Sequence, residues 1–188
     1  MVTFDDLISR REKIAVVGLG YVGLPLAVEL ARHYAVVGYD LKLQRITELK
    51  AAFDRTLEVT ADRLKHSEID YTHDPAALSA CKLIVVAVPT PIDSYRIPDL
   101  GALRAASKAV GKHMDKGTCI VFESTVYPGA TEEVCVPILE HESGLRLGHG
   151  FTVGYSPERI NPGDKVHTVD KIVKVVAGSD PPTRELLM

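Results

Sequence analysis

The stretch Ile14-Ala15-Val16-Val17-Gly18-Leu19-Gly20-Tyr21-Val22-Gly23 decides the fold of this 188-residue chain. Its first four residues are all apolar, which is typical of a strand buried on both faces of a sheet. The pattern G-x-G-x-x-G follows at Gly18–Gly23, and a helical segment with Pro25 in its first turn comes directly after it. Because strand, glycine-rich turn and helix stand in this order, the stretch predicts the first unit of a Rossmann-type domain.

The glycine-rich turn predicts a binding site for the pyrophosphate of a dinucleotide. Gly18 would permit the sharp turn, Gly20 would let the backbone approach the phosphates, and Gly23 would let the helix pack close to the strand. Backbone N–H groups and the helix dipole would stabilise the phosphate charge. The alternative is a structural turn without a ligand. The expected phosphate-binding residues are Gly18, Leu19, Gly20, Tyr21, Val22 and Gly23.

The acid at the end of the second predicted strand, Ala35–Asp40, indicates which dinucleotide binds. Asp40 lies about 20 residues beyond the first glycine, where an acid accepts hydrogen bonds from the adenosine ribose. A carboxylate there would repel a 2′-phosphate, so Asp40 favours NAD over NADP. Lys42 and Arg45 follow closely, however, and a nearby arginine can accept that phosphate instead.

Apolar segments of strand length alternate with helical segments along the rest of the chain. This alternation predicts an α/β fold with a doubly wound, mostly parallel sheet and helices on both faces. The expected strands are Ile14–Gly18, Ala35–Asp40, Ile69–Thr72, Leu83–Pro89, Thr118–Glu123, Phe151–Tyr155 and Ile172–Ala177. The expected helices are Val22–His33, Leu43–Phe53, Leu100–Met114 with Asp99 as its N-cap, and Thr131–His141. Asp54–Ser67 is polar and is either a helix or a mobile excursion.

Three of the predicted strands end in sequences that suit a ligand site, because ligands bind at the carboxyl ends of parallel strands. Val88-Pro89-Thr90-Pro91 is a rigid turn. Glu123–Gly129 has two hydroxyls, Ser124 and Thr125, which either hold a cofactor or water or cap the next helix. Ser156–Asp164 places a carboxylate, a guanidinium and an amide on one loop, where the carboxylate is either a general base or part of a surface ion pair.

Composition narrows the classes of protein to which the chain can belong. Twenty-two basic and 25 acidic residues give a net charge of −3 without a basic run, so we expect no nucleic acid or membrane partner. The three cysteines are widely spaced and argue for a reducing compartment, so we expect a cytoplasmic location. The histidines form no close ligand pair, and we expect no metal.

Taken together, the motifs resemble those of the UDP-glucose/GDP-mannose dehydrogenase family, specifically its amino-terminal NAD-binding domain. The resemblance covers nearly the whole chain, and five motifs occur in the family's order. They are Gly18–Ala27, Asp40 with Arg45, Val88–Pro91, Glu123–Gly129 and Ser156–Asp164.

The resemblance implies an enzyme of polysaccharide biosynthesis that oxidises the C6 alcohol of a nucleotide sugar to a carboxylate with two NAD, through a thioester on a cysteine. It implies that Arg45 joins Asp40 and the glycine turn in holding the adenosine diphosphate, and that the nicotinamide lies near the rigid turn and the hydroxyl pair. It also implies a water-ordering role for Thr125 and a base in thioester hydrolysis at Glu158. The implied nicotinamide-side residues are Val88, Pro89, Thr90, Ser124, Thr125 and Val126, and the implied substrate-binding residues are Glu158, Arg159, Ile160 and Asn161.

Two departures from the family pattern refine this expectation. Pro162 stands where members acting on UDP-glucose usually carry a second Glu, and P-E-R-I-N-P-G is similar to the branch that oxidises UDP-N-acetylhexosamines. The family's nucleophilic cysteine lies in a G-G-x-C-x-P-K stretch that this chain lacks. Its own cysteines, Cys81, Cys119 and Cys135, are better interpreted as buried small hydrophobes.

We therefore expect residues 1–188 to be a single NAD-binding domain, the amino-terminal part of a longer enzyme that acts as a homodimer or larger assembly. The central helix and a carboxyl-terminal UDP-binding domain would be absent, and this chain alone would be inactive. The helix-opening sequence from Pro181 to Met188 supports a continuing polypeptide. The alternatives are a free-standing NAD-binding regulatory module, a UDP-glucose 6-dehydrogenase as the parent enzyme, or another dehydrogenase with the same phosphate turn.

Overall fold

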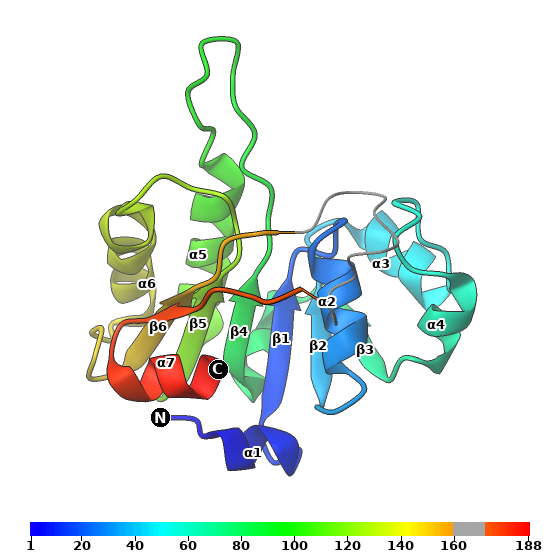
Figure 1. Ribbon diagram of the computed structural model, residues 1–188, viewed down its shortest axis with the longest axis horizontal. Coiled ribbons are helices and arrows are strands. Elements are labelled where there is room, and N and C mark those ends of the chain that lie inside the picture. The colour runs from blue at the N-terminus through cyan, green and yellow to red at the C-terminus, as the bar shows by residue number, and fades with distance from the viewer. Residues whose placement is uncertain (160–171) are drawn as a thin grey trace.

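The computed structural model describes residues 1–159 and 172–188. Its centre is one seven-stranded sheet, whose arrangement can be followed in Figure 1. The strands lie in the order β3-β2-β1-β4-β5-β6-β7, with all neighbours parallel except β6 and β7. The predicted doubly wound, mostly parallel sheet is therefore confirmed. The strands are β1 Lys13–Val17, β2 Val36–Tyr39, β3 Ile69–Thr72, β4 Cys81–Val86, β5 Thr118–Phe122, β6 Phe151–Tyr155 and β7 Ala177–Gly178.

Helices cover both faces of the sheet, because successive strand residues point to opposite faces and are apolar on each. Ile84 and Ile120 belong to a core with residues of α5 and α6, whereas Val16 and Val121 face the other side, where α2, α3 and α7 lie. The helices are α1 Phe4–Ile8, α2 Gly23–Leu30, α3 Leu43–Lys50, α4 Ala61–His66, α5 Gly101–His113, α6 Val136–Ser143 and α7 Pro181–Leu187. The 3₁₀ turn η1 spans Pro75–Ala80, and the π turn η2 spans Thr131–Cys135.

The strand order places the ligand site. β1 pairs with β2 on one side and with β4 on the other. After β1 the chain builds β2 and β3 toward one edge of the sheet, and it then returns to build β4 and the later strands toward the other edge. At such a switch point the loops after the two strands diverge and leave a crevice at their carboxyl ends. The loop from β4 to α5 extends from the carboxyl ends of the strands (Figure 1). Within this loop, Ile92 and Pro98 form an isolated antiparallel bridge.

The strand predicted at Ile172–Ala177 is wrong except at its last residue. In the described segment 172–178, the residues that pair with β6 are Ala177 and Gly178, and they do so antiparallel. Val173 and Val175 are exposed, so the apolar pattern does not mark a buried strand. Lys174 instead forms an ion pair with Glu123, a contact between distant residues that strand propensity does not encode.

The helix boundaries also differ from the sequence prediction. α3 ends at Lys50 and the chain turns at Ala52, which has φ of 57°. Its buried apolar residues are Ile46 and Leu49, while Leu43 is exposed. The ambiguous segment 54–67 is a loop followed by the short helix α4.

Candidate cofactor and catalytic site

A cavity of ≈ 520 Å³ lies at the carboxyl ends of β1, β2, β4 and β5. This is within the volume range of small-molecule sites, about 300–1,000 Å³. The predicted site residues that line it are Gly18, Leu19, Gly20, Tyr21, Val22, Asp40, Arg45, Val88, Pro89, Thr90, Ser124, Thr125 and Glu158. Gly23, Val126 and Arg159 do not line it, and Ile160 and Asn161 lie outside the described residues.

The glycine-rich turn at Gly18–Gly23, called the phosphate turn below, has a backbone shape that fits a pyrophosphate. Gly18 has φ of +93°, and a Cβ atom there would lie 2.9 Å from the carbonyl oxygen of Ala87. A Cβ atom on Gly23 would lie 1.9 Å from the carbonyl oxygen of Gly18, so only glycine permits this close packing. A Cβ atom on Gly20 would meet nothing within 4 Å, because this glycine faces the open cavity. The turn therefore offers exposed backbone at the N-terminus of α2, where an anion is stabilised.

Leu19 is held through both of its backbone polar groups by charged side chains. Oδ2 of Asp40 accepts a hydrogen bond from the Leu19 N–H at 2.9 Å, and Nε of Arg45 donates to the Leu19 carbonyl at 2.8 Å. Oδ1 of Asp40 accepts from the Lys42 N–H at 2.9 Å. Each carboxylate oxygen has further acceptor capacity, so Asp40 can still accept hydrogen bonds from ribose hydroxyls.

Arg45 lies beneath the turn and is only 4% exposed. Its Nη2 donates to Oδ1 of Asp54 at 2.8 Å, which leaves Nη1 as a buried donor with no partner within the described part of the chain. Such an orphan donor beside the cavity suits an anionic or hydroxyl-rich ligand. The residues at this end of the cavity therefore fit the adenosine diphosphate half of NAD.

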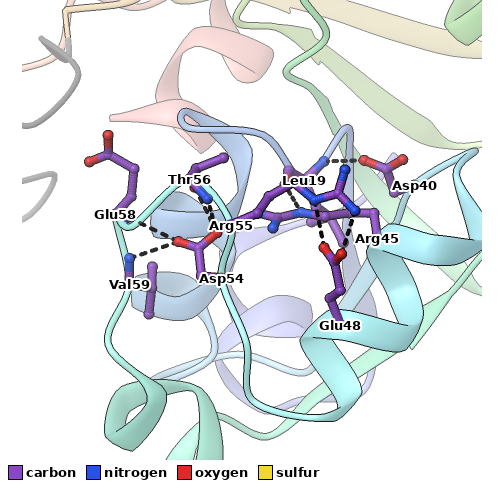
Figure 2. A network of polar contacts seen from close by, with 9 residues as sticks. All are labelled: Leu19, Asp40, Arg45, Glu48, Asp54, Arg55, Thr56, Glu58 and Val59. Atoms are coloured by element: carbon purple, nitrogen blue, oxygen red, sulfur yellow. Dashed lines mark hydrogen bonds and ion pairs between the residues drawn. The ribbon is translucent and has the colours of Figure 1, made fainter.

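Asp54 joins Arg45 to the loop that follows α3, as Figure 2 shows. Its carboxylate accepts hydrogen bonds from the hydroxyl and N–H of Thr56 and from the N–H groups of Glu58 and Val59, at 2.7–3.0 Å. Burial disfavours the charged form, but the hydrogen bonds from Thr56, Val59 and Arg45 outweigh it and lower the pKa of Asp54. The carboxylate is thus ionised and holds this side of the site together.

At the other end of the cavity, two hydroxyls join the loops that follow β4 and β5. Ser124 Oγ donates to the Val88 carbonyl at 2.6 Å, and Thr90 Oγ1 donates to the Thr125 carbonyl at 2.5 Å. The Ser124 hydroxyl therefore fixes one loop to the other and does not cap the next helix. Thr125 itself is exposed and lines the cavity.

Glu123 is a site residue to which sequence reasoning assigned no role. It directly follows β5 at the cavity, is 7% exposed, and accepts a hydrogen bond from Lys174 Nζ at 2.6 Å. Burial raises the pKa of Glu123, Lys174 opposes this shift, and the charge of Glu158 adds to it. Asp40 and Glu123 each directly follow a parallel strand, at the same end of the sheet. This position in the sequence is a signal that could have identified Glu123 as a site residue, whereas its partner Lys174 has no such signal.

Glu158 lines the same end of the cavity, three residues after the end of β6. Its Oε1 accepts a hydrogen bond from the Arg159 N–H at 2.7 Å. The structure thus brings Glu123, Thr125 and Glu158 to one cavity at the carboxyl ends of the strands. Glu123 and Thr125 follow β5, whereas Glu158 follows β6.

The cysteines are unsuited to nucleophilic chemistry. All three are buried and free, as the sequence predicted. Burial raises the pKa of Cys81 and of Cys119 to about 11, and raises that of Cys135. The thiolate is the reactive form, so these thiols are inert at neutral pH. In the described residues, no three potential ligands gather as a metal site requires, and none of the helices is long and apolar enough to cross a membrane.

Residues 12–188 match the NAD binding domain of the UDP-glucose/GDP-mannose dehydrogenase family. The chain belongs to this family. The cofactor of the domain is accordingly NAD, which agrees with the glycine turn and with Asp40.

Two curated proteins are similar over most of the chain. The UDP-N-acetyl-D-glucosamine 6-dehydrogenase of Pseudomonas aeruginosa is 55% identical, over 93% of this chain and 42% of its own length. Protein CapL of Staphylococcus aureus is 58% identical, over 88% of this chain and 39% of its own length. The solved UDP-D-ManNAc dehydrogenase of Pyrococcus horikoshii is 33% identical, with a TM-score of 0.84 over 93% of this chain and 43% of that one. The chain thus spans about two fifths of the length of these relatives.

Proposed function

We propose that this chain is the NAD-binding domain of a UDP-N-acetylhexosamine 6-dehydrogenase, which oxidises the C6 alcohol of its sugar to a uronic acid with two NAD. The observation that carries the proposal is that one cavity at the switch point has the phosphate turn and Asp40 at one end and Glu158 at the other. Relatives 55% and 37% identical to this chain are named as dehydrogenases of UDP-N-acetyl-D-glucosamine and UDP-N-acetyl-D-mannosamine. Pro162, in the P-E-R-I-N-P-G form, supports the same sugar class over UDP-glucose.

The residues of the chain divide the work by their position in the cavity. The turn at Gly18–Gly23 binds the pyrophosphate through backbone N–H groups, and Asp40 accepts hydrogen bonds from the adenosine ribose. The joined loops at Val88–Thr90 and Ser124–Thr125 form the wall beside the nicotinamide. When bound, NAD supplies a hydride acceptor at that wall.

Glu158 and Thr125 act on water in this proposal. Thr125 orders a water molecule at the nicotinamide end, and the Glu158 carboxylate takes a proton from it as the thioester is hydrolysed. The ion pair between Glu123 and Lys174 fixes the end of β5, from which Thr125 is presented. The chain therefore contributes a cofactor site and a base.

The nucleophile is a separate requirement. Since Cys81, Cys119 and Cys135 are buried and inert, the thioester needs a cysteine that these 188 residues do not provide. We infer that this cysteine and most of the UDP-sugar site belong to further polypeptide, that the complete enzyme is a cytoplasmic dimer or larger assembly, and that its uronic acid product enters polysaccharide biosynthesis. The burial of all three cysteines also favours a second candidate function, an NAD-binding regulatory module, because such a module needs no nucleophile.

The decisive experiment joins residues 1–188 to the part of the P. aeruginosa UDP-N-acetyl-D-glucosamine 6-dehydrogenase that lies beyond the match. The chimera should reduce NAD when given UDP-N-acetylglucosamine, while Glu158→Gln in the same chimera should lower kcat without abolishing NAD binding. The 188-residue chain alone should bind NAD and produce no NADH. Sustained NADH production by the chain alone would contradict the proposal. A folded, NAD-binding chimera without turnover would favour the regulatory module.

A further inference from the structure

The adenosine end of the cavity contains more positive charge than an NAD site needs. Lys42, Arg45 and Arg55 all line it together with Asp40. Arginine and lysine beside the adenosine ribose are the groups that bind the 2′-phosphate of NADP. Because the domain belongs to an NAD-binding family, some feature of the chain must prevent these cations from doing so.

Both guanidinium groups are held by carboxylates, as Figure 2 shows. Arg45 pairs with Asp54 in the interior, where the two side chains are 5% and 1% exposed. Arg55 makes a two-pronged contact with Glu48, in which its Nε donates to Oε2 at 2.6 Å and its Nη2 donates to Oε1. A fork-to-fork pair of this kind fixes the plane of the guanidinium as well as its position.

The two pairs differ in whether the arginine could turn toward a ligand. Arg45 is buried and is also bonded to the Leu19 carbonyl, so its position is fixed by the fold. The side chain of Arg55 is 42% exposed at the rim of the cavity, and within the described part of the chain its ion-pair partner is Glu48. The hydrogen bonds that Arg55 donates to Glu48 contribute most to raising the pKa of Arg55, and Asp40 is close enough for its charge to add to the rise. Arg55 is therefore the guanidinium that a 2′-phosphate at Asp40 could recruit.

We propose that Glu48 is a cofactor-specificity residue, which holds the Arg55 guanidinium away from the 2′-phosphate of NADP. Selectivity for NAD then has two components: Asp40 repels the phosphate, and Glu48 retains the cation that would otherwise offset the repulsion. The proposal rests on the proposed seating of the adenosine ribose at Asp40. It assigns a function to a residue that lies one helix away from the phosphate turn, on α3.

The test is Glu48→Gln, which keeps the side-chain shape and helix propensity but removes the charge that holds Arg55. We measure dissociation constants of NAD and NADP by calorimetry at low ionic strength for the wild-type chain, Glu48→Gln and the double variant Glu48→Gln/Arg55→Gln. We expect the NADP-to-NAD affinity ratio of Glu48→Gln to rise about tenfold, the size of one charge-assisted hydrogen bond at a partly exposed site. The rise should shrink as salt is added, because the freed contact is exposed. The double variant should return the ratio to its wild-type value.

Each other outcome overturns the inference. An equal gain for NAD and NADP would mean that Arg55 acts on the pyrophosphate that the two cofactors share. An unchanged ratio, or a raised ratio that persists in the double variant, would mean that Arg55 does not reach the 2′ position. If the wild-type chain binds NAD, any of these results leaves the proposed function standing. If the wild-type chain does not bind NAD, both the proposed function and the role of Glu48 are overturned.

Discussion

Asp54 should be worth more to stability than any other ion-pair carboxylate among the described residues, because its pair with Arg45 is the most deeply buried of them. Replacing Asp54 by Ala leaves the Arg45 guanidinium in the interior with its Nη2 unpaired. It also removes the acceptor for the N–H of Val59, which is 4% exposed. The substitution thus strands a charge and a backbone donor at once.

The expected loss follows from these two groups. Removing one partner of a buried pair costs about 3–5 kcal/mol, since the remaining charge is uncompensated. An unsatisfied buried donor costs about 1–3 kcal/mol, and the two effects share one site and do not simply add. We therefore expect Asp54→Ala to lower the free energy of unfolding by about 3–5 kcal/mol. Arg45→Leu in the same chain removes the stranded charge, so the double variant should lose less than the sum of the single variants.

Urea unfolding followed by circular dichroism measures this loss, and Glu68→Gln is the matched control. The Arg10–Glu68 pair is 47% and 80% exposed, so its removal should cost about 0–1 kcal/mol. The pKa of Asp54 is lowered in the folded state, so its stabilisation is complete above the unfolded value near 3.8 and disappears as pH falls through the folded value. The difference in the free energy of unfolding between wild type and Asp54→Ala should accordingly become smaller in strong acid. A loss below about 1 kcal/mol at neutral pH would refute the buried-pair argument.

Three further predictions concern the turn, the nicotinamide end and the cysteines. Gly23→Ala should destabilise the fold because its Cβ would meet the Gly18 carbonyl, whereas Gly20→Ala should leave thermal unfolding unchanged and weaken NAD binding; equal unfolding temperatures for the two variants would contradict this. Carbon NMR should show the Glu123 carboxyl titrating above 4.5, and higher still in Lys174→Met, and a titration at or below 4.5 would argue against its burial. The three buried thiols should resist a disulfide reagent at neutral pH until urea is added, and rapid labelling of the folded chain would contradict their inertness.

The part of the site that the sequence predicts well is the part made by local backbone. Gly18, Gly20 and Gly23 act within one turn, and their roles follow from the absence of a Cβ atom at each position. Asp40 is predictable for a similar reason, because the end of a strand that pairs with β1 must lie beside that turn. The fold class follows in the same way from the alternation of apolar strands and helical segments.

The part that the sequence does not predict depends on side chains that meet across loops. Arg45 was expected to hold the cofactor by resemblance, and its pairing with Asp54 is set by how the chain turns back after α3. The Glu123–Lys174 pair joins residues 51 positions apart, and it accompanies a segment that was expected to be a strand. Neither pairing has a local signal in spacing or periodicity.

The central claim, that the cavity between Asp40 and Glu158 is an NAD site, is tested most directly by calorimetric titration of NAD and NADP into the chain and into Asp40→Ala. The account predicts that the wild-type chain binds NAD in preference to NADP. Asp40→Ala should weaken NAD binding about tenfold or more, because the substitution removes the charged acceptor to which the ribose hydroxyls donate. It should also reduce the preference for NAD over NADP. NAD affinity unchanged in Asp40→Ala, or equal affinity of the wild-type chain for the two cofactors, would contradict it.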